Sequence, residues 1–138
     1  MGIDVGTRRI GLAISDRTRT LARPLTTIAI ASADEGVRRV AEHARVLAAE
    51  DDSLTTIVVG LPTRLDGTPN DQTARVHEFI ASLKQLTEIP IVAADERLSS
   101  VEAESRLGGR FKDWRERKKK LDAAAAAVIL QDFLDMQT

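Results

Sequence analysis

The sequence predicts one α/β domain over residues 1–138, with a mixed sheet flanked by helices. Its 138 residues fit the size of a single domain, and its 43% hydrophobic and 30% charged residues are typical of a folded globular protein. Three strand-like segments come first, and helical and strand-like segments then alternate. The crossover connections between parallel strands are expected to be right-handed.

The first 30 residues predict an antiparallel meander. Apolar segments at 3–5, 10–15 and 25–30 are typical of strands, and the polar, glycine-containing segment 6–9 favours a tight connection. Two further strands are expected, one at 56–59, ended by Gly60 and Pro62, and one at 89–93.

Helices are expected at 33–49, 70–86 and 100–107, and from about residue 115 onward. Ser32 and Glu35 form a capping-box pattern before the first, and Gly108 and Gly109 end the third. The alanine run at 123–127 combines high helix propensity with small side chains, which lets the last helix pack close to a sheet.

The composition excludes several kinds of chemistry. The chain has no Cys and two His, and His43 and His77 are expected to be ordinary surface or boundary residues on helices, so a zinc site or a thiol nucleophile is not expected. Aromatic residues make up 3% of the chain, which disfavours a broad stacking platform for single strands. The sequence shows neither a signal peptide nor a membrane-spanning run, so a cytoplasmic location is expected. Because the chain has no Cys and only two His, any catalysis is expected to use carboxylates.

Positive charge is concentrated in two segments. The formal net charge is −1, yet residues 1–23 hold five Arg and two Asp, and residues 106–120 hold eight Lys or Arg and two acids. Phe111 and Trp114 lie among the cations of the second segment, a mixture that suits a nucleic-acid partner. The alternative is a solvated, charged helix face.

Three acidic positions are candidates for a shared site. Asp4 lies within the first strand, where a lone charge is costly to bury; Asp95 and Glu96 end a strand, and only one of the two can face Asp4; Asp122 begins the apolar face of the last helix. Each has a structural alternative, respectively a turn cap, a partner of an arginine, and an ion pair with Lys118. If they converge at one sheet edge, their oxygens suit Mg²⁺, which supports phosphodiester hydrolysis.

Four sequence motifs, in order along the whole chain, resemble those of a known family. They are GIDVGTRRIG at 2–11, VVGLP at 58–62 with DG at 66–67, DERLSS at 95–100, and KKKLDAAA at 118–125 with IL at 129–130. They closely resemble the YqgF-like proteins, the pre-16S rRNA nucleases related to Holliday junction resolvases. Family members have several more apolar residues before the first motif, so a short first strand is expected here.

The resemblance implies a ribonuclease H-like fold with a five-stranded mixed sheet flanked by helices. It places Asp4, Glu96 and Asp122 at the family's acidic triad, as catalytic residues and as ligands of Mg²⁺ or Mn²⁺, and so selects Glu96 over Asp95. It implies a bacterial cytoplasmic nuclease that trims the 5′ end of the 16S rRNA precursor, as a monomer or homodimer and without a membrane partner; branched DNA is the alternative substrate. The residues expected to contact nucleic acid are Thr7, Arg9, Arg97, Ser99, Arg110, Lys112, Arg115, Lys118 and Lys119.

Two other functions remain open from the sequence. The segment 4–7 (DVGT) also resembles the phosphate loop of sugar kinases and actin-like ATPases, but those proteins enclose a nucleotide between two such domains and this chain has room for one. The other alternative is a non-catalytic module whose basic segment docks on rRNA or on a ribosome assembly factor, with binding that weakens as salt rises.

Overall fold

A five-stranded mixed sheet forms the centre of the computed structural model, which describes residues 1–51, 54–62, 68–95 and 114–137. The strand order is β3-β2-β1-β4-β5, antiparallel between β1 and β2 and between β2 and β3, and parallel between β1 and β4 and between β4 and β5. This confirms the predicted sheet. The strands are β1 (Gly2–Val5), β2 (Arg9–Ser15), β3 (Ala22–Ala29), β4 (Ile57–Leu61) and β5 (Ile91–Asp95).

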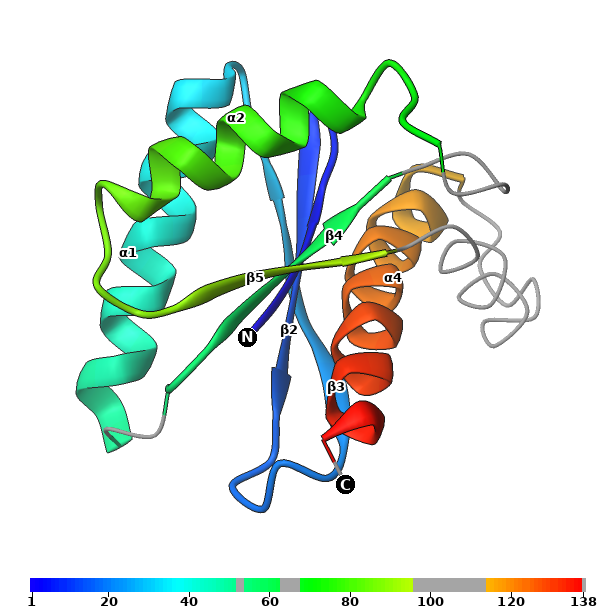
Figure 1. Ribbon diagram of the computed structural model, residues 1–138. Helices are drawn as coiled ribbons and strands as arrows, with labels where there is room; N and C mark the ends of the chain where they lie inside the picture. The colour runs from blue at the N-terminus through cyan, green and yellow to red at the C-terminus, as the bar shows by residue number, and fades with distance from the viewer. Residues whose placement is uncertain (52–53, 63–67, 96–113, 138) are drawn as a thin grey trace.

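Helices cover both faces of the sheet. Figure 1 shows α1 (Ala33–Asp51) and α2 (Thr73–Lys84) on one side and α4 (Trp114–Met136) on the other. The expected helix at 100–107 lies outside the described residues. None of the helices in the described part of the chain is long and apolar enough to cross a membrane.

Strand alternation divides the core into two layers. Ile3, Ile10 and Val59 are fully buried against α1 and α2, in a cluster that includes Val40 and Phe79. The strand residues between these positions face α4, and on that face most strand side chains are small or absent. On that side Ala13 and Val58 pack with the alanine-rich stretch of α4 and with Ile129 and Leu130. The small residues of both surfaces let α4 lie close to the sheet, as the alanine run predicts.

Most element boundaries lie within two residues of the predicted ones, although β4 continues through Gly60 to Leu61 instead of ending at 59. Three differences have a clear local reason. β3 begins at Ala22 rather than at 25, with Pro24 tolerated because β3 is an edge strand and its register shifts beside Ala13. α2 begins at Thr73 rather than at 70, because the Asn70 side chain accepts hydrogen bonds from the backbone N–H groups of Gln72 and Thr73 in a turn.

The third difference is in β5, which spans Ile91–Asp95 rather than 89–93. Its register with β4 pairs Ile57 with Ile91 and Leu61 with Asp95, and Pro90 contributes only its carbonyl oxygen, which accepts a hydrogen bond from Ile57 at 2.9 Å. The N-terminal cap predicted for α1 is present: the Ser32 hydroxyl accepts from the Glu35 N–H at 3.1 Å, and the Glu35 carboxylate accepts from the N–H of Ala31, one residue before Ser32, at 2.9 Å.

Candidate active site

Asp4 lies on the face of the sheet that α4 covers. It is half-buried on β1 and pairs with Gly11 of β2, and residues that pair directly across antiparallel strands share a face. A Cβ at Gly11 would lie 2.0 Å from the carbonyl oxygen of Asp122 in α4, which identifies that face. The side chain of Asp4 therefore projects from the sheet beside the turn of α4 that carries Asp122.

Glycines set the distance between α4 and the sheet at this point. A Cβ at Gly2 would lie 2.7 Å from the Ala126 carbonyl oxygen. In the same way, a Cβ at Gly11 would collide with the backbone of Asp122. Real Cβ atoms do not approach backbone atoms so closely, so β1 and β2 must have glycine where α4 crosses them. The same close packing brings Asp122 to the sheet beside Asp4.

Arg9 holds the carboxylate of Asp122. The Arg9 Nε–H donates to Asp122 Oδ2 at 2.9 Å, joining β2 to α4 across 113 positions of sequence. The two side chains are only 22% and 25% exposed, so the ion pair is partly shielded from solvent and stronger than an exposed one. Sequence spacing offered Lys118 as the partner of Asp122, but the side chain of Lys118 lies outside the described residues.

The register separates Asp95 from Asp4. Asp95 pairs with Leu61, which packs against the core under α1 and α2, so Asp95 belongs to the opposite face of the sheet. The expectation that only one of Asp95 and Glu96 can share a face with Asp4 is consistent with this alternation. Glu96 itself lies outside the described residues.

The expected nucleic-acid contacts are only partly described. Thr7 is exposed in the connection between β1 and β2, where the Gly6 N–H donates to the Arg9 carbonyl oxygen at 2.9 Å. Arg9 points to Asp122, as given above. The other seven positions lie outside the described residues or have side chains that do: Arg97, Ser99, Arg110, Lys112, Arg115, Lys118 and Lys119.

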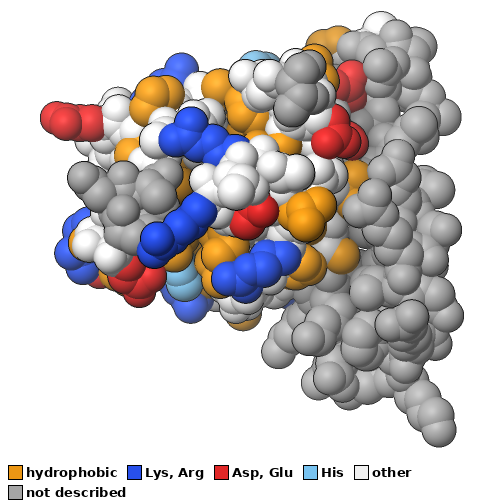
Figure 2. All heavy atoms as spheres, turned by 90° about the horizontal axis from the view of Figure 1, so that it is seen from below, with side chains coloured by type: hydrophobic (Ala, Val, Ile, Leu, Met, Phe, Trp, Pro, Cys, Tyr) orange, Lys and Arg blue, Asp and Glu red, His pale blue; other side chains and the backbone are white. Residues whose placement is uncertain are grey.

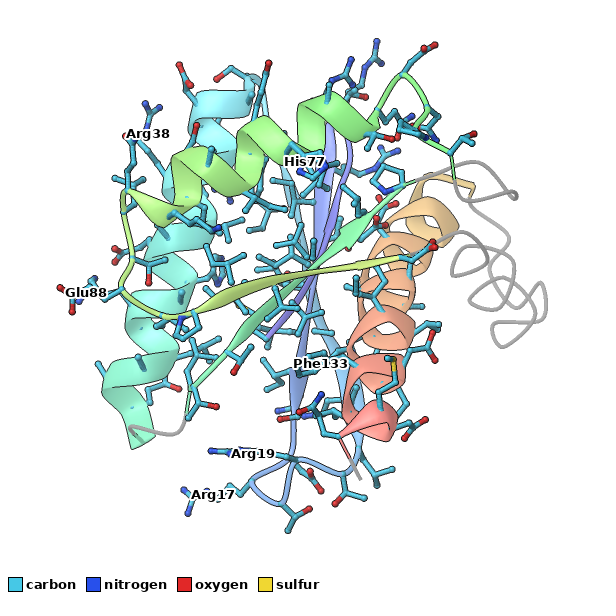
Figure 3. All side chains as sticks on the ribbon, viewed as in Figure 1. Arg17, Arg19, Arg38, His77, Glu88 and Phe133 are labelled. Atoms are coloured by element: carbon cyan, nitrogen blue, oxygen red, sulfur yellow. The ribbon has the colours of Figure 1, made fainter. Side chains whose placement is uncertain are left out.

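Sequence reasoning missed two features of the site. It did not identify Gly11, although a glycine inside a strand often marks a close backbone approach. It also placed Arg9 on phosphate alone and did not anticipate its bond to Asp122, because no local spacing relates two residues so far apart. His43 and His77 lie on α1 and α2, and Figure 3 shows His77 on the side of the sheet away from α4.

The described acids suit a hard divalent cation but do not form a complete set. No group of three possible ligands occurs among residues 1–51, 54–62, 68–95 and 114–137, and two carboxylates on neighbouring elements are present there. Carboxylate oxygens are the ligands that Mg²⁺ and Mn²⁺ take. Asp4 and Asp122 fit such an ion, with a third acid required to complete the group.

Three comparisons relate the chain to known proteins. A protein named "Putative pre-16S rRNA nuclease" from Roseiflexus sp. (strain RS-1) is 42% identical over 137 residues, covering 99% of this chain and 94% of that protein. One of the same name from Anaeromyxobacter sp. (strain K) is 42% identical over 135 residues, covering 98% and 95%. The structure of Thermus thermophilus RuvC in complex with a Holliday junction substrate superposes with a TM-score of 0.56 at 16% identity, over 99% of this chain and 93% of that one.

The fold similarity to RuvC confirms the ribonuclease H-like architecture that the motifs imply. The match to the Roseiflexus protein covers 99% of this chain, so the aligned region contains Asp4, the segment around Glu96, and Asp122. Residues 1–136 also match the family model described as RuvX, Holliday junction resolvase, and the chain therefore belongs to the RuvX family.

Proposed function

We propose that this protein is a metal-dependent nuclease that hydrolyses phosphodiester bonds in structured nucleic acid, with the 5′ end of the 16S rRNA precursor as its substrate. The observation that carries the proposal is the placement of Asp4 beside Asp122 on one face of the sheet, where α4 crosses Gly11. The names of the relatives from Roseiflexus and Anaeromyxobacter support the choice of RNA. Such a substrate implies a cytoplasmic location.

Asp4, Glu96 and Asp122 are the residues that would hold Mg²⁺ or Mn²⁺. When bound, such an ion would polarise the scissile phosphate, make the attacking water easier to deprotonate and stabilise the leaving oxygen. The chain's own groups orient these parts. Arg9 fixes Asp122 through Nε, and its remaining N–H donors suit a phosphate oxygen of the substrate. The Glu96 carboxylate accepts a proton from the attacking water.

A second candidate activity is the cleavage of branched DNA. It is favoured by the family description and by the likeness to RuvC, whose structure contains a Holliday junction. Both activities use the same acidic residues, so they differ in substrate and not in chemistry.

A cleavage assay with both polymers tests the proposal. The purified protein with Mn²⁺ is expected to cut a fragment that spans the 5′ end of the 16S rRNA precursor faster than a four-way DNA junction. Asp4→Asn and Asp122→Asn, which remove a charge and keep the shape, are expected to lower the rate on the order of a hundredfold or more. Asp34→Asn is the matched control, because Asp34 is an exposed acid at the start of α1 on the other side of the sheet.

Each outcome separates the candidates. Faster cutting of the junction supports the DNA activity instead. RNA binding that survives the loss of all three acids, with no cleavage under any metal, supports the non-catalytic module and refutes the nuclease.

A further inference from the structure

The turn that joins β2 to β3 holds an arginine in an unfavourable backbone conformation. Arg19 has φ 58°, the only positive φ among the described non-glycine residues. Glycine or asparagine is the usual residue in this left-handed region, where a long side chain adds a steric cost. An observed strain of this kind points to a role for the side chain that is there.

Asp16 builds the turn around Arg19. One carboxylate oxygen of Asp16 accepts from the Thr20 N–H at 2.9 Å and the Leu21 N–H at 3.2 Å, and the other accepts from the Thr18 hydroxyl at 2.8 Å. These bonds hold the pKa of the Asp16 carboxyl below its usual value, the Thr20 N–H first among them. The carboxylate is thus engaged within the turn and fixes the backbone on which Arg19 lies.

α4 clamps the base of the hairpin. The Gln131 Oε1 accepts from the Ala22 N–H at 2.9 Å, and its Nε2 donates to the Thr20 carbonyl oxygen, also at 2.9 Å. The same amide group donates to Asp135 at 3.0 Å. The hairpin is therefore fixed to the helix that carries Asp122, which gives its tip a defined position relative to the candidate active site.

Three exposed arginines gather at this end of the sheet. Arg17, Arg19 and Arg23 line one cleft of about 250 Å³, in which Asp16 and Glu50 are the acidic groups. Neither Arg19 nor Arg23 has a side-chain hydrogen bond or ion pair within the described part of the chain. Figure 3 shows Arg17 and Arg19 pointing outward from the hairpin. Figure 2, seen from below relative to Figure 1, shows Lys and Arg side chains on this end of the molecule.

The hairpin and the candidate active site lie at opposite ends of the same strand. β2 has seven residues, from Arg9 beside Asp122 to Ser15 before the turn. At about 3.4 Å per residue the six steps from Arg9 to Ser15 span about 20 Å, the length of about six base pairs of B-form DNA. A mononucleotide or short single strand at Asp4 and Asp122 cannot reach the arginines, whereas a helical arm of that length can.

We propose that the β2–β3 hairpin, through Arg17, Arg19 and Arg23, is a second contact for the phosphate backbone of a double-helical arm of the substrate. This inference rests on the proposed function, which supplies the choice of nucleic acid as the ligand. Guanidinium groups bind phosphate oxygens through paired N–H donors, and the phosphate backbone is accessible in both A-form RNA and B-form DNA. The contact would select substrates with a stem next to the cleavage point, in RNA or in DNA.

The decisive variant is Arg19→Gly, because glycine suits the backbone at this position. The variant is expected to unfold at a temperature no lower than that of the wild type while it binds duplex more weakly. A purely structural role for Arg19 would not separate these two readouts. Arg17→Gln and Arg23→Gln, alone and combined with Arg19→Gly, test the other two arginines. Arg38→Ala is the matched control, since Arg38 is an exposed arginine on α1, far from the hairpin in Figure 3.

Binding is measured in the Asp4→Asn background with EDTA, so that cleavage plays no part. The probes are labelled stem-loops. One has a stem of about 12 base pairs, which is longer than the span of β2, and the other has a stem of about 4 base pairs, which is shorter. Each arginine that contacts a phosphate is expected to contribute about 1 to the slope of log affinity against log salt on the long stem. The triple variant is expected to lose about 3 of that slope on the long stem and none on the short one. RNA and DNA stems are compared in parallel.

Two results would overturn the inference. One is an unchanged slope on the long stem in the triple variant; the other is no binding of either stem by the Asp4→Asn protein that keeps all three arginines. Normal hairpin-dependent binding without cleavage in the Asp4-containing protein would instead refute the nuclease and leave this surface supported.

Discussion

Arg9 and Asp122 join the second strand of the sheet to the last helix through one short hydrogen bond, from Nε to Oδ2 at 2.9 Å. Both side chains are about three-quarters buried. The bond neutralises an acid of the candidate active site and fixes the rotation of its carboxylate, so it links the fold to the proposed chemistry.

Removing Arg9 is expected to destabilise the protein. Arg9→Gln removes the guanidinium that bonds the partly buried Asp122 carboxylate, at a cost of about 1–2 kcal/mol of unfolding free energy in urea. Arg45→Gln is the control, because the Arg45–Glu42 pair is fully exposed on α1, where solvent screens the charges, and its loss is expected to change stability much less. Equal losses in the two variants would contradict a structural role for the buried pair. A double-mutant cycle with Asp122→Asn measures the coupling directly.

Gly11→Ala is expected to be among the most damaging single substitutions in the sheet. The new Cβ would lie 2.0 Å from the Asp122 carbonyl oxygen, so α4 must move away from β2, at a cost of about 3 kcal/mol or more in unfolding free energy. Chemical denaturation measures the loss, and nuclease activity is expected to fall with it.

Gly36→Ala is the matched control for this prediction. Its Cβ would meet the Ile10 Cδ1 at 2.8 Å, which is the end of a flexible side chain, and alanine favours the helix that contains it. The expected change is within about 1 kcal/mol of zero. A loss in Gly36→Ala as large as that in Gly11→Ala would show that the close approach of α4 is not the cause.

Stability is expected to rise with pH between 6 and 8. Burial lowers the pKa of the Met1 α-amino group from 8.0 to about 6, and the group donates to the Thr56 carbonyl oxygen at 2.9 Å. Between these values the unfolded chain binds more protons than the folded one, so raising the pH stabilises the fold, by about 2 kcal/mol from pH 6 to 8. Urea unfolding across this range measures the slope.

The two histidines provide the control for this pH dependence. A protein with His43→Gln and His77→Gln has no imidazole, so the rise in stability that it retains belongs to the amino group. A flat profile in that variant would refute the assignment to Met1.

Gln131→Ala is expected to release the β2–β3 hairpin from α4. The substitution removes a partly buried hydrogen bond from the Ala22 N–H and an exposed one to the Thr20 carbonyl oxygen, and is expected to cost about 1 kcal/mol. Faster hydrogen exchange at the Ala22 amide identifies the released contact. Gln72→Ala, at an exposed position before α2 whose side chain makes no capping bond, is expected to leave exchange at Ala22 unchanged.

The sequence was most informative where a local pattern decides the structure. Short apolar segments predicted all five strands, and Ser32 with Glu35 predicted the start of α1, because these signals depend on near neighbours. The boundaries at Pro24, Asn70 and Pro90 were less predictable, since the register of a neighbouring strand or a side-chain bond to the backbone sets each of them.

The candidate site was predicted in kind but not in detail. Carboxylates on the first strand and the last helix pointed to one sheet edge, and the structure brings Asp4 and Asp122 to the same face. The bond from Arg9 and the requirement for glycine at position 11 depend on contacts over more than 100 residues, which no spacing rule reveals.

The distance in sequence between Asp4 and Asp122 also sets when the two can meet. A ribosome makes β1 and β2 long before it makes α4, and the glycine-lined face of these strands stays bare until that helix has been synthesised and has docked. A partly translated chain therefore lacks the acidic pair altogether. Docking of α4 onto β1 and β2 is therefore the folding step that assembles the pair.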